Sequence, residues 1–258
     1  MRAIVIAGCL LVAAWPAAVW PQDGPPSAVV QRPTETETAV TVAPRYVEFD
    51  GGLFLGEDLI ETPATVRFGL VRGAELLAAV SPIVIHDSGE PNERSGVGDL
   101  AAGAKIWFVD QGVSMPALAL QGLVKLPTGE DAVSSGELDY SITAIATRRY
   151  SQLVADLNGG IDLLGRDKAN GDHVFDEIWR AGASAVWMPQ ERFSYVAELY
   201  GRFVPDQDID QVTLNLGLIY GANETFLIDG AVRLGLSEDA SDAAITFGLT
   251  KLLGKGID

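Results

Sequence analysis

The sequence predicts an all-β protein: a transmembrane antiparallel β-barrel of about twelve strands in the outer membrane of a Gram-negative cell. Three observations lead to this prediction. Apolar and polar residues alternate with a period of two over most of the chain. The connections between these segments are short and long in turn. After the N-terminus, no apolar run reaches the roughly 18 residues that a helix needs to cross a bilayer.

The composition excludes other classes of protein. Of the 258 residues 48% are hydrophobic, and 35 acidic residues outnumber 18 Lys and Arg, which gives a formal charge of −17. Nucleic acid is not an expected partner, because phosphate contacts require Lys and Arg. A disordered chain is not expected either, because disorder accompanies low hydrophobicity.

Residues 1–22 are predicted to be a cleaved signal peptide. Arg2 supplies the positive start, and an apolar core follows over residues 3–12. Cys9, the sole cysteine, ends a sequence similar to a lipoprotein cleavage site, but too few apolar residues precede it for lipidation to be the favoured interpretation. Once the signal is removed, the chain has no thiol for a disulfide, a metal site or a nucleophile.

Three further segments complete the predicted domain organisation. Residues 23–44 are rich in Pro, Thr, Glu and Val without periodicity, and are expected to be a flexible lead-in. The barrel is predicted to follow over residues 45–253, with a short tail over residues 254–258.

The alternation is clearest in segment 153–163. Leu153, Leu157 and Leu163 face one way there, whereas Asp156 and Asp162 face the other. Pro82 is an exception within its own segment, because a central strand tolerates a missing N–H poorly. The twelve predicted strands are 45–55, 64–71, 75–85, 98–108, 117–126, 140–149, 153–163, 178–188, 193–203, 211–220, 225–236 and 243–252.

The connections between these strands alternate in length. Tight turns are predicted at 72–74, 189–192 and 221–224, and polar loops of about a dozen residues at 86–97, 127–139 and 165–177. Short periplasmic turns and long external loops are typical of an outer-membrane barrel. A soluble β-sandwich gives no reason for short turns to lie at one end and long loops at the other.

Most of the negative charge falls on the long loops, which hold 20 of the 35 acidic residues and 3 of the 18 basic ones. Simple solvation accounts for this pattern. The alternative is that the carboxylates bind divalent cations, such as those that bridge lipopolysaccharide, because hard cations prefer oxygen ligands. No loop has the spacing of a Ca²⁺ motif, so no metal site is predicted.

Aromatic residues cluster at the predicted strand ends, as in the girdles of membrane barrels. Trp179 and Phe203 lie at the long-loop ends. The set at the short-turn ends is Tyr46, Phe108, Tyr150, Trp187, Phe193, Tyr220 and Phe226.

One face of each strand meets lipid and must be apolar, so the charged residues are expected to line the lumen. The near balance of their charges leaves two compatible interpretations: a solute pathway, or an ion-pair network that fills a narrow interior. Glu48, Asp50, Asp162 and Arg202 belong to this face as well. The residues predicted to shape a solute pathway are Arg67, Glu75, Asp99, Lys105, Lys125, Asp156, Arg180, Glu198, Asp229 and Arg233.

No catalytic residue and no cofactor are predicted. The two histidines, His86 and His173, both lie in loops, and phosphate-binding, zinc and dinucleotide motifs are absent from the sequence. A lipid-modifying barrel enzyme is the remaining alternative, with His86 beside Ser88. A nucleophile and its base are brought together by the fold, however, and seldom by sequence adjacency.

Several short motifs follow one another in order between residues 45 and 252. They are Arg67-Phe68-Gly69-Leu70, Glu75-Leu76-Leu77, Gly96-Val97-Gly98-Asp99 with Lys105, Leu126-Pro127-Thr128-Gly129-Glu130, Asp156-Leu157-Asn158-Gly159-Gly160 and the segment 220–236. Their order and spacing resemble the outer-membrane barrel family described as putative MetA-pathway of phenol degradation. The resemblance implies a transporter or pore for small solutes, including aromatic ones. It also implies outer-membrane lipid, lipopolysaccharide and the barrel-insertion machinery as partners.

Overall fold

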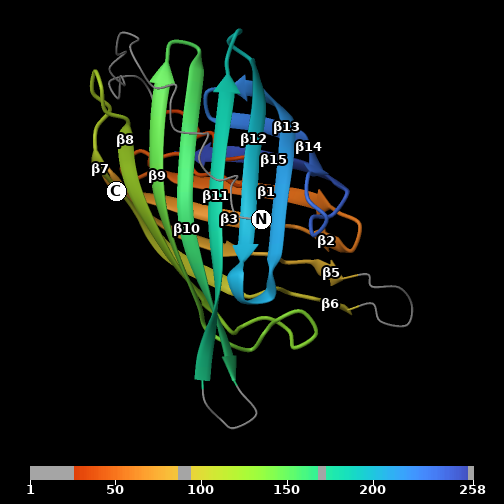
Figure 1. Cartoon of the computed structure of the whole chain (residues 1–258). Coiled ribbons are helices and arrows are strands. Elements are labelled where there is room, and N and C mark those ends of the chain that lie inside the picture. Colours follow the sequence, from red (N-terminus) through yellow and green to blue (C-terminus); the bar gives the residue numbers. More distant parts are fainter. Residues whose placement is uncertain (1–25, 87–93, 168–172, 255–258) are drawn as a thin grey trace.

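A computed structural model of the chain describes residues 26–86, 94–167 and 173–254. Twelve antiparallel strands close into one barrel (Figure 1). Closure is made by the last strand, β15 (Ala243–Leu253), which pairs with the first, β1 (Val47–Leu55), along the whole length of β1. The predicted twelve-stranded barrel is therefore confirmed.

The other strands of the wall each pair with their neighbours in the chain. They are β3 (Ala64–Val71), β4 (Ala74–Val80), β7 (Leu100–Val109), β8 (Ala117–Leu126), β9 (Asp139–Tyr150), β10 (Leu153–Asp167), β11 (His173–Trp187), β12 (Phe193–Val204), β13 (Ile209–Asn223) and β14 (Phe226–Gly235). Within the described ranges, no helix combines the length and the hydrophobicity needed to cross a membrane.

Large apolar side chains are exposed on the outer face of the barrel, and charged side chains are buried inside it. Leu157 and Leu199 point outward with half or more of their surface exposed, whereas Glu48, Glu75 and Lys105 are fully buried in the lumen. This arrangement is the inverse of a soluble core and is the one that a lipid-facing barrel requires.

The third predicted strand, 75–85, is corrected by the structure. The wall strand β4 ends at Val80, and β5 (Val84–His86) follows after Pro82. The chain leaves the wall because Pro82 cannot donate to the ladder. There β5 pairs with two other short strands, β2 (Leu59–Glu61) and β6 (Arg94–Gly96).

The predicted loop at 165–177 is also corrected, because most of it continues β10 and β11. The two strands remain in register as far as Asp167 and His173. Polar cross-strand pairs hold this extension: Arg166 forms a bidentate pair with Asp176, and His173 Nδ1 lies 3.0 Å from Asp167 Oδ1. Outside the membrane both faces of a hairpin can be polar, so the hydrophobic alternation that marks a strand is missing.

The aromatic girdle agrees with the prediction at most positions. Phe108, Trp187 and Phe193 are exposed near the short-turn ends, and Trp179 is exposed toward the long loops. Tyr46 differs, because it packs inward against a cluster that includes Val29 and Val42 of the N-terminal segment.

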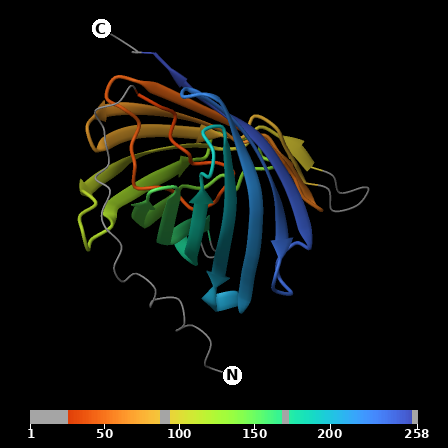
Figure 2. The same cartoon turned by 90° about the horizontal axis from the view of Figure 1, so that it is seen from above.

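The N-terminal segment 26–44 lies inside the barrel, where the sequence predicted a flexible lead-in. Figure 2 shows this segment, in red, within the ring of strands. Its ends lie near the short-turn side, since Ala28 N donates to Glu224 O and Arg45 N to Gly69 O. The predicted signal peptide, residues 1–22, lies outside the described residues, as do residues 255–258 of the predicted tail.

Candidate functional site

We refer to residues 26–44 as the plug segment. Its backbone amides donate to side chains that the barrel wall projects inward. Val29 N donates to Glu48 at 2.7 Å, and Val42 N to Glu75 at 2.6 Å. Near the tip, Glu198 accepts from Glu35 N at 3.1 Å and from Thr36 N at 2.6 Å. Three buried wall carboxylates therefore hold the plug segment by its backbone, and charged acceptors make such bonds strong.

Uncharged wall groups extend this hold along the segment. Ala39 N donates to Thr147 Oγ1 at 2.7 Å, and Ala39 packs against Trp107 and Ile145. Asn158 both accepts from Glu37 N and donates to Glu37 O, at 2.7 and 2.9 Å. These contacts satisfy backbone groups that would otherwise be buried without partners.

Glycines on the inner face give the plug segment its space. A Cβ at Gly69 would overlap the carbonyl groups of Val42 and Ala43, and one at Gly182 would overlap Thr36. Glycine weakens a strand interior and often marks a close approach by another part of the chain. The approach here is by the plug segment.

A network of ion pairs lies between the plug segment and the wall. Lys105 Nζ is 3.0 Å from Glu75 Oε1 and 3.6 Å from Glu37 Oε2. Arg67 pairs with Asp50 and lies 3.6 Å from Glu37. Glu37 of the plug segment thus links two cationic side chains of the wall.

Further out, toward the long loops, the ion pairs are more accessible. Lys125 Nζ lies 2.6 Å from Asp139 and 3.1 Å from Asp99. Arg180 pairs with Asp162 at 2.9 Å. Arg233 pairs with Glu35 at the tip of the plug segment.

Asp99, which precedes β7, also anchors the loop between β8 and β9. Its carboxylate accepts from Gly129 N at 2.8 Å and from Ser134 Oγ at 2.8 Å. Burial alone would raise the pKa of Asp99, but these hydrogen bonds and the Lys125 ammonium outweigh burial and lower it below its ordinary value.

All ten predicted pathway residues lie on the inner face or at its outer rim. Eight of them form ion pairs, Glu198 accepts hydrogen bonds from the plug backbone, and Asp156 accepts a short hydrogen bond from Thr147 Oγ1 at 2.5 Å. Sequence reasoning missed their partners Arg32, Glu35 and Glu37, because an aperiodic segment gives no indication of where it folds. Residues 34–38 alternate Thr and Glu, and this polar run in an exported chain with 48% hydrophobic residues was the available signal.

Open space remains on both sides of the plug tip. Two cavities of about 450 and 430 Å³ lie toward the long loops, and both include Asp162 in their lining. A third, of about 190 Å³, is lined by Glu35 and Glu37 of the plug segment and by Arg180 and Tyr200 of the wall, among others. The outer lumen is thus a hollow region bounded below by the plug segment.

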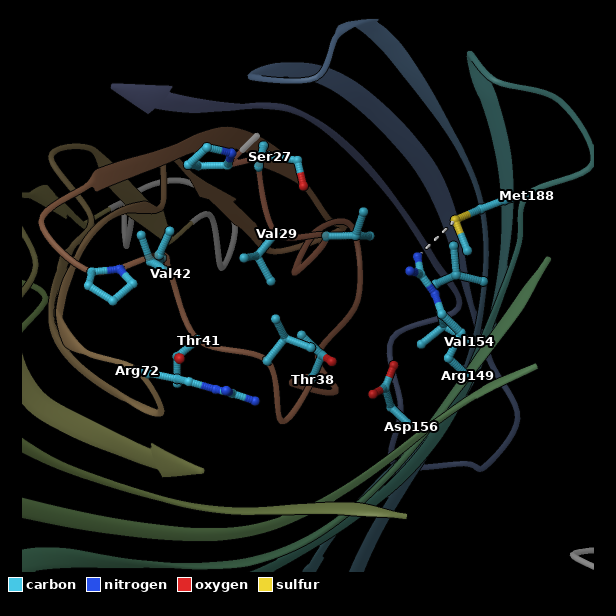
Figure 3. A pocket seen from close by; sticks show the side chains of 17 residues that line it. Ser27, Val29, Thr38, Thr41, Val42, Arg72, Arg149, Val154, Asp156 and Met188 are labelled. Carbon is cyan, nitrogen blue, oxygen red and sulfur yellow. Dashed lines mark hydrogen bonds between the residues drawn. The ribbon is translucent and has the colours of Figure 1, made fainter. Parts of the chain in front are cut away.

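A fourth cavity, of about 260 Å³, lies at the short-turn end between the plug segment and the wall (Figure 3). Its lining is mixed: Val29 and Val42 from the plug segment and Val154 from the wall are aliphatic, whereas Arg72 and Arg149 carry charge. Asp156 supplies a carboxylate at its margin. We refer to it as the inner cavity.

Neither histidine lines any of these four cavities. His86 ends β5, and His173 begins β11, where it faces Asp167 and Glu137. One nitrogen or oxygen of each of these last three side chains lies within 4.8 Å of the others, on the exposed rim. The sequence predicted no metal site, and that remains a prediction.

A closed barrel with an apolar outer face and a charged, partly filled lumen is the fold of an outer-membrane β-barrel. Similar solved structures share this fold. An outer-membrane channel from Pseudomonas putida F1 is 13% identical, with a TM-score of 0.66 over 87% of this chain and 100% of that one. The NanC porin is 12% identical, with a TM-score of 0.56 over 80% of this chain and 100% of that one. The KdgM porin is 10% identical, with a TM-score of 0.53 over 79% of this chain and 98% of that one.

The chain belongs to the family described as putative MetA-pathway of phenol degradation, whose model matches residues 21–250. The resemblance seen in the sequence motifs and the outer-membrane location are both confirmed. No curated protein matches the chain.

Proposed function

We propose that the barrel is a channel for small solutes across the outer membrane, and that the plug segment controls passage through it. The observation that carries this proposal is the hollow outer lumen, with cavities of about 450 and 430 Å³, the larger of which reaches Glu35 at the plug tip. Cavities of this size are suited to small molecules. The plug segment enters from the short-turn side, so its displacement would join the outer lumen to the inner cavity.

The solute class that best suits the lumen is a small molecule, aromatic in part, that also carries a polar or charged group. The family description supports an aromatic compound. The aliphatic part of the inner cavity's lining supports an apolar body, whereas the arginines in that lining and the paired charges of the outer lumen oppose a purely apolar solute.

The wall charges are proposed to set the electrostatics of the route. Lys125, Arg180 and Arg233 would act in the outer lumen and Arg67 and Lys105 beside the plug segment. They would act against Glu75, Asp99, Asp156, Glu198 and Asp229. Membrane lipid surrounds such a barrel, and lipopolysaccharide and the barrel-insertion machinery are proposed as further partners.

Liposome swelling tests the proposal. Liposomes that contain the refolded barrel should swell in arabinose or sodium benzoate faster than liposomes without protein. A heat-unfolded sample, reconstituted in the same way, is the control for leakage. If the folded barrel and the control swell equally, the channel proposal fails.

The alternatives make different predictions. A surface barrel with cation-binding loops would show no swelling, but would bind a divalent metal and lose that binding with His173→Ala, since His173 belongs to the rim cluster with Glu137 and Asp167. We propose that the protein is not an enzyme. Lipid hydrolysis that disappears with His86→Ala would contradict this.

A further inference from the structure

The plug segment carries one guanidinium group, that of Arg32, into a site built by three strands of the wall. Asp229 of β14 is the cross-strand partner of Gly248 in β15, and Gly248 is in turn the partner of Gly52 in β1. The three residues form one row on the inner face. Arg32 lies across this row.

The polar contacts of Arg32 come from three kinds of oxygen. Its Nε lies 3.5 Å from Asp229 Oδ2, and its Nη2 donates to Thr246 Oγ1 at 3.0 Å and to Phe247 O at 3.1 Å. The Asp229 side chain is 2% exposed and that of Arg32 16%. A buried carboxylate, a hydroxyl and a carbonyl together match the planar, multiple-donor guanidinium group.

The two glycines give the site its shape. A Cβ built on Gly52 or on Gly248 would overlap the guanidinium of Arg32, so either side chain would displace it. Two adjacent glycines leave a flat patch of backbone on which a planar cation can lie. Gly159 is a useful contrast within the same barrel, because a Cβ there meets no atom within 4 Å.

The fit to Arg32 is incomplete. Among the described residues, neither Arg32 Nε nor Asp229 Oδ1 has a hydrogen-bond partner, although both atoms are buried. The tether through the plug backbone holds Arg32 Nε 3.5 Å from the carboxylate, whereas a free guanidinium could turn to form two parallel hydrogen bonds with it.

We propose that Gly52, Gly248, Asp229 and Thr246 form a guanidinium-binding site, that Arg32 is its resident ligand, and that solutes carrying a guanidinium group compete with Arg32 and release the plug segment. When the other contacts of the plug segment open, its short chain acts as a tether that gives Arg32 an effective concentration of the order of mM. Guanidinium compounds at about tens of mM exceed this concentration and should therefore compete with Arg32 for the site. Compact ammonium or quaternary ammonium ions should not, since they lack the planar set of donors. Only the consequence for solute passage rests on the proposed function.

The experiment reports on the plug segment and not on conduction. Ala39 is fully buried against the wall, so a cysteine placed there by Ala39→Cys, in a chain with Cys9→Ser, reacts with a maleimide only when the plug segment moves. Labelling of the refolded full-length barrel in detergent should be slow. Methylguanidinium at about 50 mM should accelerate the labelling several-fold, because this is roughly ten times the effective concentration of Arg32. Tetramethylammonium at equal ionic strength should not.

Three variants complete the test. Arg32→Ala and Gly248→Ala should each accelerate labelling by about tenfold, which corresponds to the loss of one charge-assisted hydrogen-bonded contact, and should abolish the response to methylguanidinium. Gly159→Ala should label as slowly as the parent. A heat-dependent gel shift checks that each variant is folded. The proposal is overturned if methylguanidinium acts no better than tetramethylammonium, or if folded Gly248→Ala and Arg32→Ala label like Gly159→Ala. Labelling of this kind is independent of whether the barrel passes solutes, so the two proposals can fail separately.

Discussion

At the scale of single residues, the most demanding feature is the fully buried pair of Lys105 and Glu75. Both side chains have no exposed surface, and their charged atoms lie 3.0 Å apart. Two such charges are tolerated in a narrow lumen because they pair with each other and with Glu37 and Arg67, and because Glu75 accepts from the Val42 amide of the plug segment.

Lys105→Met should therefore destabilise the barrel by about 3–5 kcal/mol, because it leaves a buried carboxylate without its closest cation. The measurement is urea unfolding in lipid vesicles. Arg166→Met is the matched control: Arg166 pairs with Asp176 on the exposed hairpin, and its loss should leave stability unchanged. Equal unfolding midpoints for the two variants would show that the Lys105 pair is not important for stability.

Asp99 leads to a prediction about pH. The folded state lowers the pKa of Asp99 below its ordinary value of 3.8, so at any pH above 3.8 the ionised carboxylate stabilises the loop at 127–138. That stabilisation is lost as the pH falls through the lower, folded value. Pepsin should cut this loop much faster at pH 2 than at pH 4.

The variant Asp99→Asn provides the control. It lacks the ionised carboxylate at every pH, so its loop should already be cut rapidly at pH 4. If the variant and the parent show the same pH profile, Asp99 is not the group that anchors the loop through Gly129 and Ser134.

At the scale of elements, the wall strands and the plug segment differ in how far the sequence predicts them. Each wall strand carries its own signal, because one face contacts lipid and the other the lumen, which forces alternation. The plug segment has no such signal. Its backbone is held by Glu48, Glu75 and Glu198, which are up to 163 residues away, and only the closed barrel brings them to it.

The element boundaries show the same limit. The end of β4 at Val80 could be anticipated from Pro82, whereas the extension of β10 and β11 could not. The pairs that hold that extension are polar, and polar segments between strands resemble loops in any sequence pattern.

Lipid exposure of β10 is tested by Leu157→Arg. Leu157 lies on the outer face with more than half its surface exposed, in the apolar part of the strand. Arginine there should cost about 2–4 kcal/mol of unfolding free energy in vesicles, the cost of a charge near the bilayer midplane. Val113→Arg, in the connection between β7 and β8, is the control. A soluble barrel would tolerate both changes equally.

At the scale of the whole molecule, the charge of −17 is distributed in a way that composition alone does not reveal. Much of it lies on the long-loop side, above a lumen in which most charged side chains form ion pairs or hydrogen bonds. The sequence pattern predicted the barrel, its inner face and nearly balanced lumen charges. It did not predict that the plug segment would complete the pairing through Arg32, Glu35 and Glu37, because pairing across the lumen depends on three-dimensional closure.

The central claim is that a movable plug segment closes the lumen of a solute channel. Planar-bilayer recording of the double variant Ala39→Cys/Ala119→Cys tests it most directly, since both residues belong to one buried cluster that joins the plug segment to the wall. Under reducing conditions the barrel should show discrete openings. Oxidation should abolish them, and reductant should restore them. Currents that are unchanged after a crosslink has been verified by mass spectrometry, or a reduced barrel that never conducts, would contradict the account.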